Sequence, residues 1–219
     1  MNYILVAALI INVPAIRQVN LSGPVADVQS RLPNNVYWDN NAITCVHEST
    51  HGINSLLRNQ YQRPAFYLLD GKAILLNEPR TTISEVARLV PPSLRGDIYQ
   101  LYLVSQQRYW NKQPSYLFNE FVSYINSAVA RQRLGIQTQG ETQYAMEFIV
   151  YSTCVVQAAY ANGEADRNTR DFLMSQIERI LPLTNDRNYL LRLQNNDATE
   201  LRIFMQRYYG IEWTKKLGV

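Results

Sequence analysis

The pattern of hydrophobic and polar positions along this chain is mainly that of helices. Apolar residues recur at intervals of three and four over long stretches, and cap-forming or turn-forming residues bound most of them. The expected helices are, in chain order, 23–31, 41–58, a short one from Thr82 to Pro91, 94–110, 114–134, 141–161, 168–181, 186–194 and 198–209.

Several of these helices carry recognisable end signals. Asn40 or Asn41 is a suitable N-cap for helix 41–58, and Asp197 for the last helix. Thr82-Ile83-Ser84-Glu85 has the form of a capping box. Gly135 follows helix 114–134 at the position where a left-handed residue ends many helices.

A smaller set of segments has the pattern of strands. Two apolar runs, 65–69 and 72–76, flank Asp70-Gly71, which predicts a hairpin. Residues 3–13 and 15–21 read as extended segments separated by Pro14, and strand-forming residues also occupy 34–39.

Together these elements predict an α+β fold that is mainly α with a small β element. We expect a single compact domain over 1–219, in which 1–80 contains the β element and 81–219 is helical. A chain of 219 residues with 47% hydrophobic residues is long and apolar enough to bury a sizeable core.

Charge and the N-terminal segment exclude some partners. The net charge is +3 and Lys215-Lys216 is an isolated basic pair, so we expect no nucleic-acid partner. The apolar run 2–13 is shorter than the roughly 20 residues of a bilayer span, so we expect no transmembrane segment. It also lacks the basic start of an export signal, which favours a core strand in a cytoplasmic protein over export. The pattern says nothing about oligomeric state.

Candidate chemistry is concentrated in His47-Glu48-Ser49-Thr50-His51, which has the form H-E-x-x-H. Positions four apart lie on the same face of a helix, so His47 and His51 can direct imidazole nitrogens at one ion. Glu48 would then lie beside a water molecule on that ion. The chain has only two histidines, and both belong to this motif. Two imidazoles with one carboxylate suit Zn²⁺, with a fourth position left for water.

The simpler alternative is a pair of histidines on an exposed helix surface beside a solvated Glu48. The apolar flanking residues argue against it, because they predict a largely buried helix in which polar groups need partners. These flanking residues are Ile43, Val46, Ile53, Leu56 and Leu57.

A zinc site needs a third protein ligand. Leu57 excludes a third histidine six residues after the second, so the ligand is an acidic residue or, less favourably, Cys154. Glu120 is the best candidate, because it lies within an apolar helical pattern where a carboxylate needs a cation; pairing with an arginine is its alternative role. Glu147 has a similar setting and is the rival, as ligand or as support for a histidine. Glu141 needs no metal to account for it, because an acidic residue in the first turn of a helix is stabilised by the helix dipole.

Cys45 and Cys154 lie in apolar helical patterns and are expected to be free thiols, with a disulfide as the alternative.

These motifs resemble those of gluzincins, the metallopeptidases that pair H-E-x-x-H on one helix with a glutamate on a later helix. Residues 119–123, Asn-Glu-Phe-Val-Ser, are similar to the N-E-x-x-S of thermolysin-like enzymes, with Glu120 as the zinc ligand. Residues 35–38 are similar to the edge strand on which those enzymes bind substrate. Tyr124 stands where that family has an aspartate, the separation of His51 from Glu120 is longer, and no further histidine is present.

The resemblance implies zinc-dependent hydrolysis of a peptide or protein substrate, with Glu48 as general base. The oxyanion would need a donor besides zinc, for which a tyrosine is the natural choice in this chain. Tyr116 is preferred over Tyr124 and Tyr144. Either 35–38 or 65–69 would bind substrate backbone as an edge strand. Two other functions stay open: a non-catalytic metal-binding or scaffold protein that retains the motif, and a hydrolase of a non-peptide amide.

Overall fold

The computed structural model describes residues 8–35, 37–136, 140–164 and 167–183, together with Ile203, Gln206, Arg207 and Gly210. The helix expected at 186–194 and the N-cap Asp197 lie outside the described residues. Of the helix expected at 198–209, only Ile203, Gln206 and Arg207 are described, and each is helical.

The predicted mainly helical fold with a small β element is confirmed over these residues. A three-stranded antiparallel sheet has the order β1-β3-β2, formed by β1 (Leu9–Asn12), β3 (Lys72–Leu75) and β2 (Ala65–Tyr67). The predicted hairpin joins β2 to β3, with Ala65 opposite Leu75. Its loop is longer than the Asp-Gly pair, because Leu69, Asp70 and Gly71 have φ values of 68°, 52° and 74° and complete the turn together.

Two other expected β segments are not strands. Residues 15–21 form an irregular segment that is held to the end of the first helix, where the Ile16 and Arg17 amides both donate to the Ser30 carbonyl (2.8 and 3.1 Å). Asn35 and Trp38 belong to a turn in which the Trp38 amide donates to the Asn35 carbonyl (3.1 Å). Val36 lies outside the described residues. The expectation of an edge strand at 35–38 is therefore wrong for the residues described there.

Six predicted helices are present close to their expected positions: α1 (Gly23–Gln29), α2 (Ala42–Tyr61), α3 (Ile83–Leu89), α6 (Ser115–Arg133), α7 (Gly140–Ala161) and α8 (Arg167–Ile180). The Asn41 side chain caps α2 by accepting from the Ile43 and Thr44 amides. Thr82 and Glu85 form the complete capping box of α3. Gly135 has a φ of 68° after α6, as its position predicted.

The single helix expected at 94–110 is instead interrupted. A 3₁₀ turn, η1 (Pro92–Leu94), precedes α4 (Asp97–Tyr99), a π-helical segment η2 (Gln100–Ser105) and α5 (Gln107–Trp110). The Gln106 amide donates to the Leu101 carbonyl (3.0 Å), five residues back, which is the π-helical spacing. Periodicity alone does not reveal such a change of hydrogen-bond register. A further 3₁₀ turn, η3 (Leu181–Leu183), follows α8.

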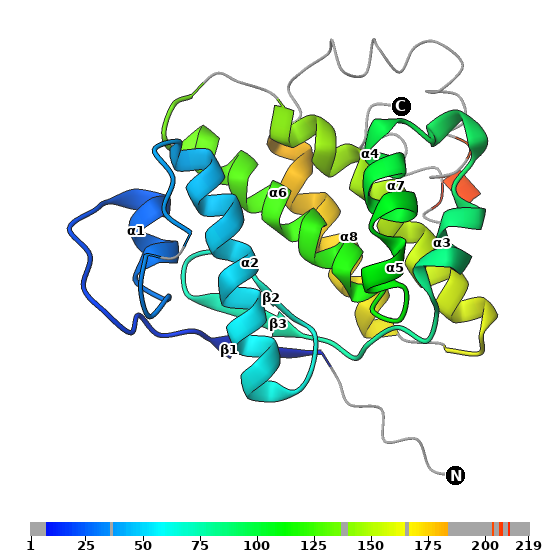
Figure 1. The fold of residues 1–219 in the computed structure, drawn as a ribbon, viewed down its shortest axis with the longest axis horizontal. Helices are drawn as coiled ribbons and strands as arrows, with labels where there is room; N and C mark the ends of the chain where they lie inside the picture. The colour runs from blue at the N-terminus through cyan, green and yellow to red at the C-terminus, as the bar shows by residue number, and fades with distance from the viewer. Residues whose placement is uncertain are drawn as a thin grey trace.

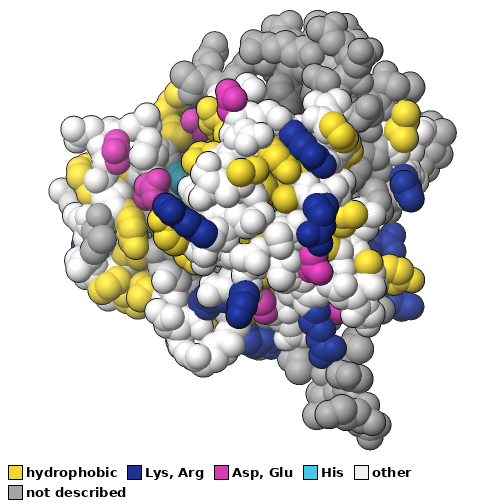
Figure 2. All heavy atoms as spheres, turned by 45° about the vertical axis from the view of Figure 1, so that its right-hand side comes forward, with side chains coloured by type: hydrophobic (Ala, Val, Ile, Leu, Met, Phe, Trp, Pro, Cys, Tyr) yellow, Lys and Arg dark blue, Asp and Glu magenta, His cyan; other side chains and the backbone are white. Residues whose placement is uncertain are grey.

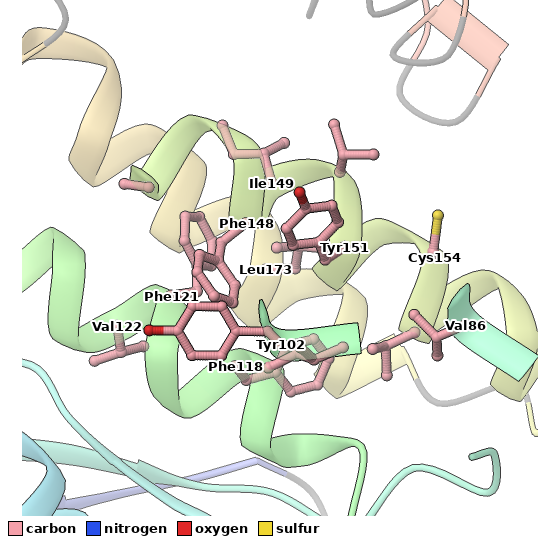
Figure 3. Close-up of a cluster of buried hydrophobic side chains, with 14 of the residues drawn as sticks. Val86, Tyr102, Phe118, Phe121, Val122, Phe148, Ile149, Tyr151, Cys154 and Leu173 are labelled. Carbon is pink, nitrogen blue, oxygen red and sulfur yellow. The ribbon is translucent and has the colours of Figure 1, made fainter. Parts of the chain in front are cut away.

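Helix α6 is the central element of the molecule. It packs against α2 on one side and α7 on the other, with α8 also in contact (Figure 1). The sheet lies beside α2, and β2 contacts both α2 and α6. The largest apolar cluster gathers around α6, α7 and α8, where Phe118, Phe121 and Phe148 pack together (Figure 3).

A second apolar cluster lies under α2 and the sheet. Four of the five apolar residues flanking the H-E-x-x-H motif are buried there, as expected for a largely buried helix, and the fifth, Leu56, is 42% exposed. Cys45 and Cys154 are buried free thiols, as predicted. In the described part of the chain, no helix combines the length and apolar character that a bilayer crossing requires.

Candidate metal centre

The packing of α2 against α6 brings together the three side chains that the sequence singled out as metal ligands. His47 and His51 lie one turn apart on α2, and their Nε2 atoms are 3.1 Å from each other. Glu120 extends from α6, and its Oε2 is 3.8 Å from His47 Nε2 and 3.5 Å from His51 Nε2. Figure 2 shows a small area of histidine surface beside acidic side chains, so the group is reached from solvent.

This geometry fits a tetrahedral zinc ion. Ligand bonds of about 2.0–2.2 Å in a tetrahedron place neighbouring ligand atoms about 3.4 Å apart. The three observed separations, 3.1, 3.5 and 3.8 Å, bracket that value. Among the described residues, this is the one group of three or more His, Cys, Asp or Glu side chains close enough to hold a metal ion.

The protonation of His47 and Glu120 also suits a cation, which would have to displace the proton that Glu120 favours on His51. Burial, and then the nearby His51, lower the pKa of His47 to about 4, so its imidazole is neutral near pH 7 and offers a lone pair. Burial alone would lower the pKa of His51, but the contact with Glu120 raises it. Burial alone would raise the pKa of Glu120, but its contacts with the two histidines lower it. A carboxylate that is stabilised in its charged form at this depth is suited to bind a positive ion.

Residues around the three candidate ligands hold them in place. Ser123 lies one turn after Glu120, and its Oγ is 3.3 Å from His51 Nδ1. That contact orients the ring so that Nε2 points at the other two ligands. The Tyr124 ring packs on the His47 ring with a centroid distance of 4.5 Å. Tyr124 thus contacts the first histidine through its ring, at the position where thermolysin-like enzymes have an aspartate.

A cavity of about 300 Å³ opens beside the cluster. Glu48 is exposed on α2 and lines this cavity together with His51 and Glu120. Its other walls come from α2 and α6, from β2, from α5 and the α5–α6 connection, and from the segment before α2. They include Tyr37, Asn54, Arg58, Ala65, Phe66, Trp110, Gln113, Tyr116 and Asn119.

Tyr116 stands at the wall of this cavity. Its hydroxyl donates to Gln106 Oε1 (2.6 Å), and its ring stacks on Trp110 with a centroid distance of 4.5 Å. Burial, and then the carboxylate of Glu120, raise the pKa of Tyr116 above its usual value, so the hydroxyl keeps its proton near neutral pH. Gln106 directly follows the π-helical segment. The interruption of the predicted helix therefore positions a residue next to the candidate site, where π-helical turns are often found.

The alternative ligands lie elsewhere. Glu147, on α7, accepts a hydrogen bond from the Tyr151 hydroxyl (3.1 Å) and is not part of the cluster. Glu141 lies 3.9 Å from Arg131. Burial raises the pKa of Cys154 to about 12, so it remains a neutral thiol. Tyr144 is partly exposed on α7 and packs on Tyr124.

Three residues near the cluster were not identified from the sequence. Ser123 was part of the N-E-x-x-S similarity but had no assigned role. Asn54 follows His51 at helical spacing, and its amide donates to Asn119 Oδ1 (2.6 Å), which joins α2 to α6 beside the ligands. That spacing was a usable signal for Asn54. No sequence signal pointed to Gln106, because its approach to Tyr116 depends on the π-helical turn.

A comparison of the chain with protein-family models, curated proteins and solved structures finds no match. The functional argument therefore rests on the geometry of the cluster and its cavity.

Proposed function

We propose that this protein is a zinc-dependent hydrolase of peptide bonds. The observation that carries the proposal is the grouping of His47, His51 and Glu120 on two packed helices, with separations that suit zinc. The exposed Glu48 carboxylate lines the cavity beside them. The resemblance of the two motifs to those of gluzincins agrees with this assignment.

In this proposal His47, His51 and Glu120 hold the ion. Zinc, when bound, supplies a Lewis acid that polarises the scissile carbonyl and lowers the pKa of a water molecule. Glu48 takes the proton of that water as general base and then transfers it to the leaving amine. Tyr116 keeps its proton near neutral pH and lies at the cavity wall, so it can donate a hydrogen bond to the oxyanion in place of its bond to Gln106.

The edge of the sheet supplies a place for substrate backbone. β2 is an edge strand, and Ala65 lines the same cavity as Glu48. An extended peptide can add to such an edge by backbone hydrogen bonds. Of the two segments considered for this role, the one at 65–69 supplies the strand.

The test combines metal analysis with one substitution. Protein purified without chelators is expected to contain about one zinc ion per chain by elemental analysis, and to cleave members of a random peptide library. Glu48→Gln is expected to retain zinc and lose cleavage, while Glu147→Gln, which changes a partly buried carboxylate outside the cluster, retains both. Absence of zinc would overturn the proposal.

Two other results would favour a different function. Zinc without turnover of any peptide would favour the non-catalytic metal-binding protein. Cleavage of simple amides but not of peptides would favour the non-peptide hydrolase, because the same base serves both reactions. Peptide cleavage that survives Glu48→Gln would contradict the role assigned to Glu48.

A further inference from the structure

The open edge of β2 is shorter than the strand itself. On its inner side β2 pairs with β3: the Pro64 carbonyl accepts from the Leu76 amide (2.9 Å), and the Leu68 amide donates to the Lys72 carbonyl (2.8 Å). Backbone groups of alternate residues in a strand point to opposite sides. The residues of β2 that direct their N–H and C=O groups outward are therefore Ala65 and Tyr67.

The outward backbone N–H and C=O groups of Tyr67 both already form hydrogen bonds. Its amide donates to Asn54 Oδ1 (2.6 Å), and its carbonyl accepts from Asn126 Nδ2 (2.8 Å). The two asparagines come from α2 and α6 and are buried, with exposures of 3% and 0%. Each is held by a further bond, Asn54 to Asn119 (2.6 Å) and Asn126 to Arg179 (2.8 Å). The edge is thus closed at Tyr67 by the same helices that provide the candidate ligands.

The edge also ends before Ala65. Pro64 has no N–H, and its carbonyl is turned toward β3. The preceding residues form the bend that ends α2, where Gln62 has a φ of 53°. Ala65 is therefore the one residue of β2 whose outward N–H and C=O groups form no hydrogen bond with another described residue. It is 3% exposed, and it lines the cavity beside the cluster, from which those two groups would be reached.

We propose, building on the proposed function, that substrate is bound at the sheet edge through a single residue pair at Ala65, and that the substrate is consequently a short peptide. The Ala65 amide would donate to one substrate carbonyl, and its carbonyl would accept from the amide of the same substrate residue. The cavity volume of about 300 Å³ agrees with this limit, since it lies at the lower end of the roughly 300–1,000 Å³ of small-molecule sites. Longer peptides gain no further backbone pairing, because Asn54 and Asn126 occupy the next outward position.

The test is a scan of backbone N-methylation, which removes one substrate N–H at a time. Random-sequence peptides of three, six and ten residues with blocked ends are titrated against zinc-loaded Glu48→Gln, so that binding is measured without turnover. We expect equal affinity at the three lengths within about twofold. The tightest six-residue peptide is then N-methylated at each position, and one position should weaken binding about tenfold, the effect of one lost hydrogen bond.

A substitution in the protein tests the other hydrogen bond of the pair. Ala65→Pro removes the outward N–H without removing a bond to β3, and proline is tolerated at such edge positions. It should weaken the same peptide about tenfold while zinc content is unchanged, and Ala65→Ser, which keeps the N–H, should not. Zinc content and thermal unfolding establish that both variants are folded.

The outcomes separate this inference from the proposed function. Affinity that rises with length, two or more sensitive positions at alternating residues, no sensitive position, or no peptide binding would each overturn the single-pair limit. Peptide binding with one sensitive position, but no cleavage by the unsubstituted protein, would uphold the limit and overturn the proposed hydrolase.

Discussion

At the scale of single residues, Glu120 and Glu147 form a matched pair of helical carboxylates with different surroundings, the first buried and the second partly buried. Glu120 faces the two histidines, whereas Glu147 accepts from the Tyr151 hydroxyl. Glu120→Gln is expected to weaken zinc binding by more than about 100-fold, since loss of residues that merely support ligands costs about 10–100-fold. Glu147→Gln should leave zinc affinity unchanged. Competition with a zinc-binding dye measures both, and equal effects of the two substitutions would remove Glu120 from the ligand set.

Ser123 permits a second prediction at this scale. Its hydroxyl lies 3.3 Å from His51 Nδ1, on the ring side away from the candidate metal. Ser123→Ala should weaken zinc binding about tenfold, because the ring is no longer held in its ligating orientation. Ser127→Ala is the control, since Ser127 lies one turn further on α6 and donates only to the Ser123 carbonyl. The same dye competition applies, and equal affinities for the two variants would show that Ser123 does not orient His51.

At the scale of elements, Gly52 fixes how the segment before α2 packs on that helix. A Cβ atom at Gly52 would lie 2.3 Å from Cε2 of Tyr37 and 3.1 Å from Cδ2 of Leu32. Gly52→Ala should therefore lower the free energy of unfolding by about 1–3 kcal/mol, because the Tyr37 ring must move out of its place in the cavity wall.

The matched variant for this contact is Gly52→Ala in a Tyr37→Ala background. In that background Gly52→Ala should lower the free energy of unfolding by less than about 1 kcal/mol, because the Tyr37 ring is absent and alanine favours helix more than glycine does. Urea unfolding of the four proteins gives the coupling between the two positions. An unchanged cost in the Tyr37→Ala background would mean that another neighbour resists the methyl group.

The hairpin loop carries a pH-dependent contact between elements. Arg133, at the end of α6, donates to both carboxylate oxygens of Asp70 (2.8 and 2.7 Å), and this lowers the pKa of Asp70 in the folded protein. A carboxyl whose pKa is lower in the folded than in the unfolded chain stabilises the fold above the unfolded value, near pH 4, and loses that contribution as pH falls further.

Asp70→Asn is thus expected to lower the free energy of unfolding near pH 7 by at most about 1 kcal/mol, because the pair is exposed. The difference from the unsubstituted protein should shrink below about pH 3. Asparagine tolerates the positive φ of this position, so the loop conformation is retained. Urea unfolding at several pH values measures the difference, and a difference that is the same at low and neutral pH would exclude the ion pair as its cause.

At the scale of the whole molecule, a bound ion would join α2 to α6, the helix around which the larger core is built. Saturating zinc should therefore stabilise the fold, by about 4 kcal/mol when its free concentration is 1,000 times the Kd. For a chain of this size that corresponds to a rise in Tm of about 8–16 °C, reversed by a chelator. Calorimetry with and without zinc tests this. Glu120→Gln should show a much smaller rise, and an equal rise would place the ion elsewhere.

The sequence by itself determined the elements whose signals are local. Helical periodicity, the Asn41 cap, the Thr82–Glu85 capping box and the Asp70-Gly71 turn each act within a few residues, so their structures followed from composition and spacing. The relation of His47 to His51 was equally local, because one helical turn sets it. The local pattern did not predict the π-helical turn before Gln106, because α-helical and π-helical hydrogen bonding fit a similar spacing of apolar residues.

Only the tertiary structure decided which carboxylate meets the histidines and which backbone groups remain open. Glu120 and Glu147 have similar local patterns, and the packing of α6 against α2 brings the first of them to the cluster. The restriction of the open edge to Ala65 depends likewise on two asparagines from different helices that bond to Tyr67. Such contacts join residues far apart in the chain, and a one-dimensional pattern of hydrophobic and polar positions does not contain them.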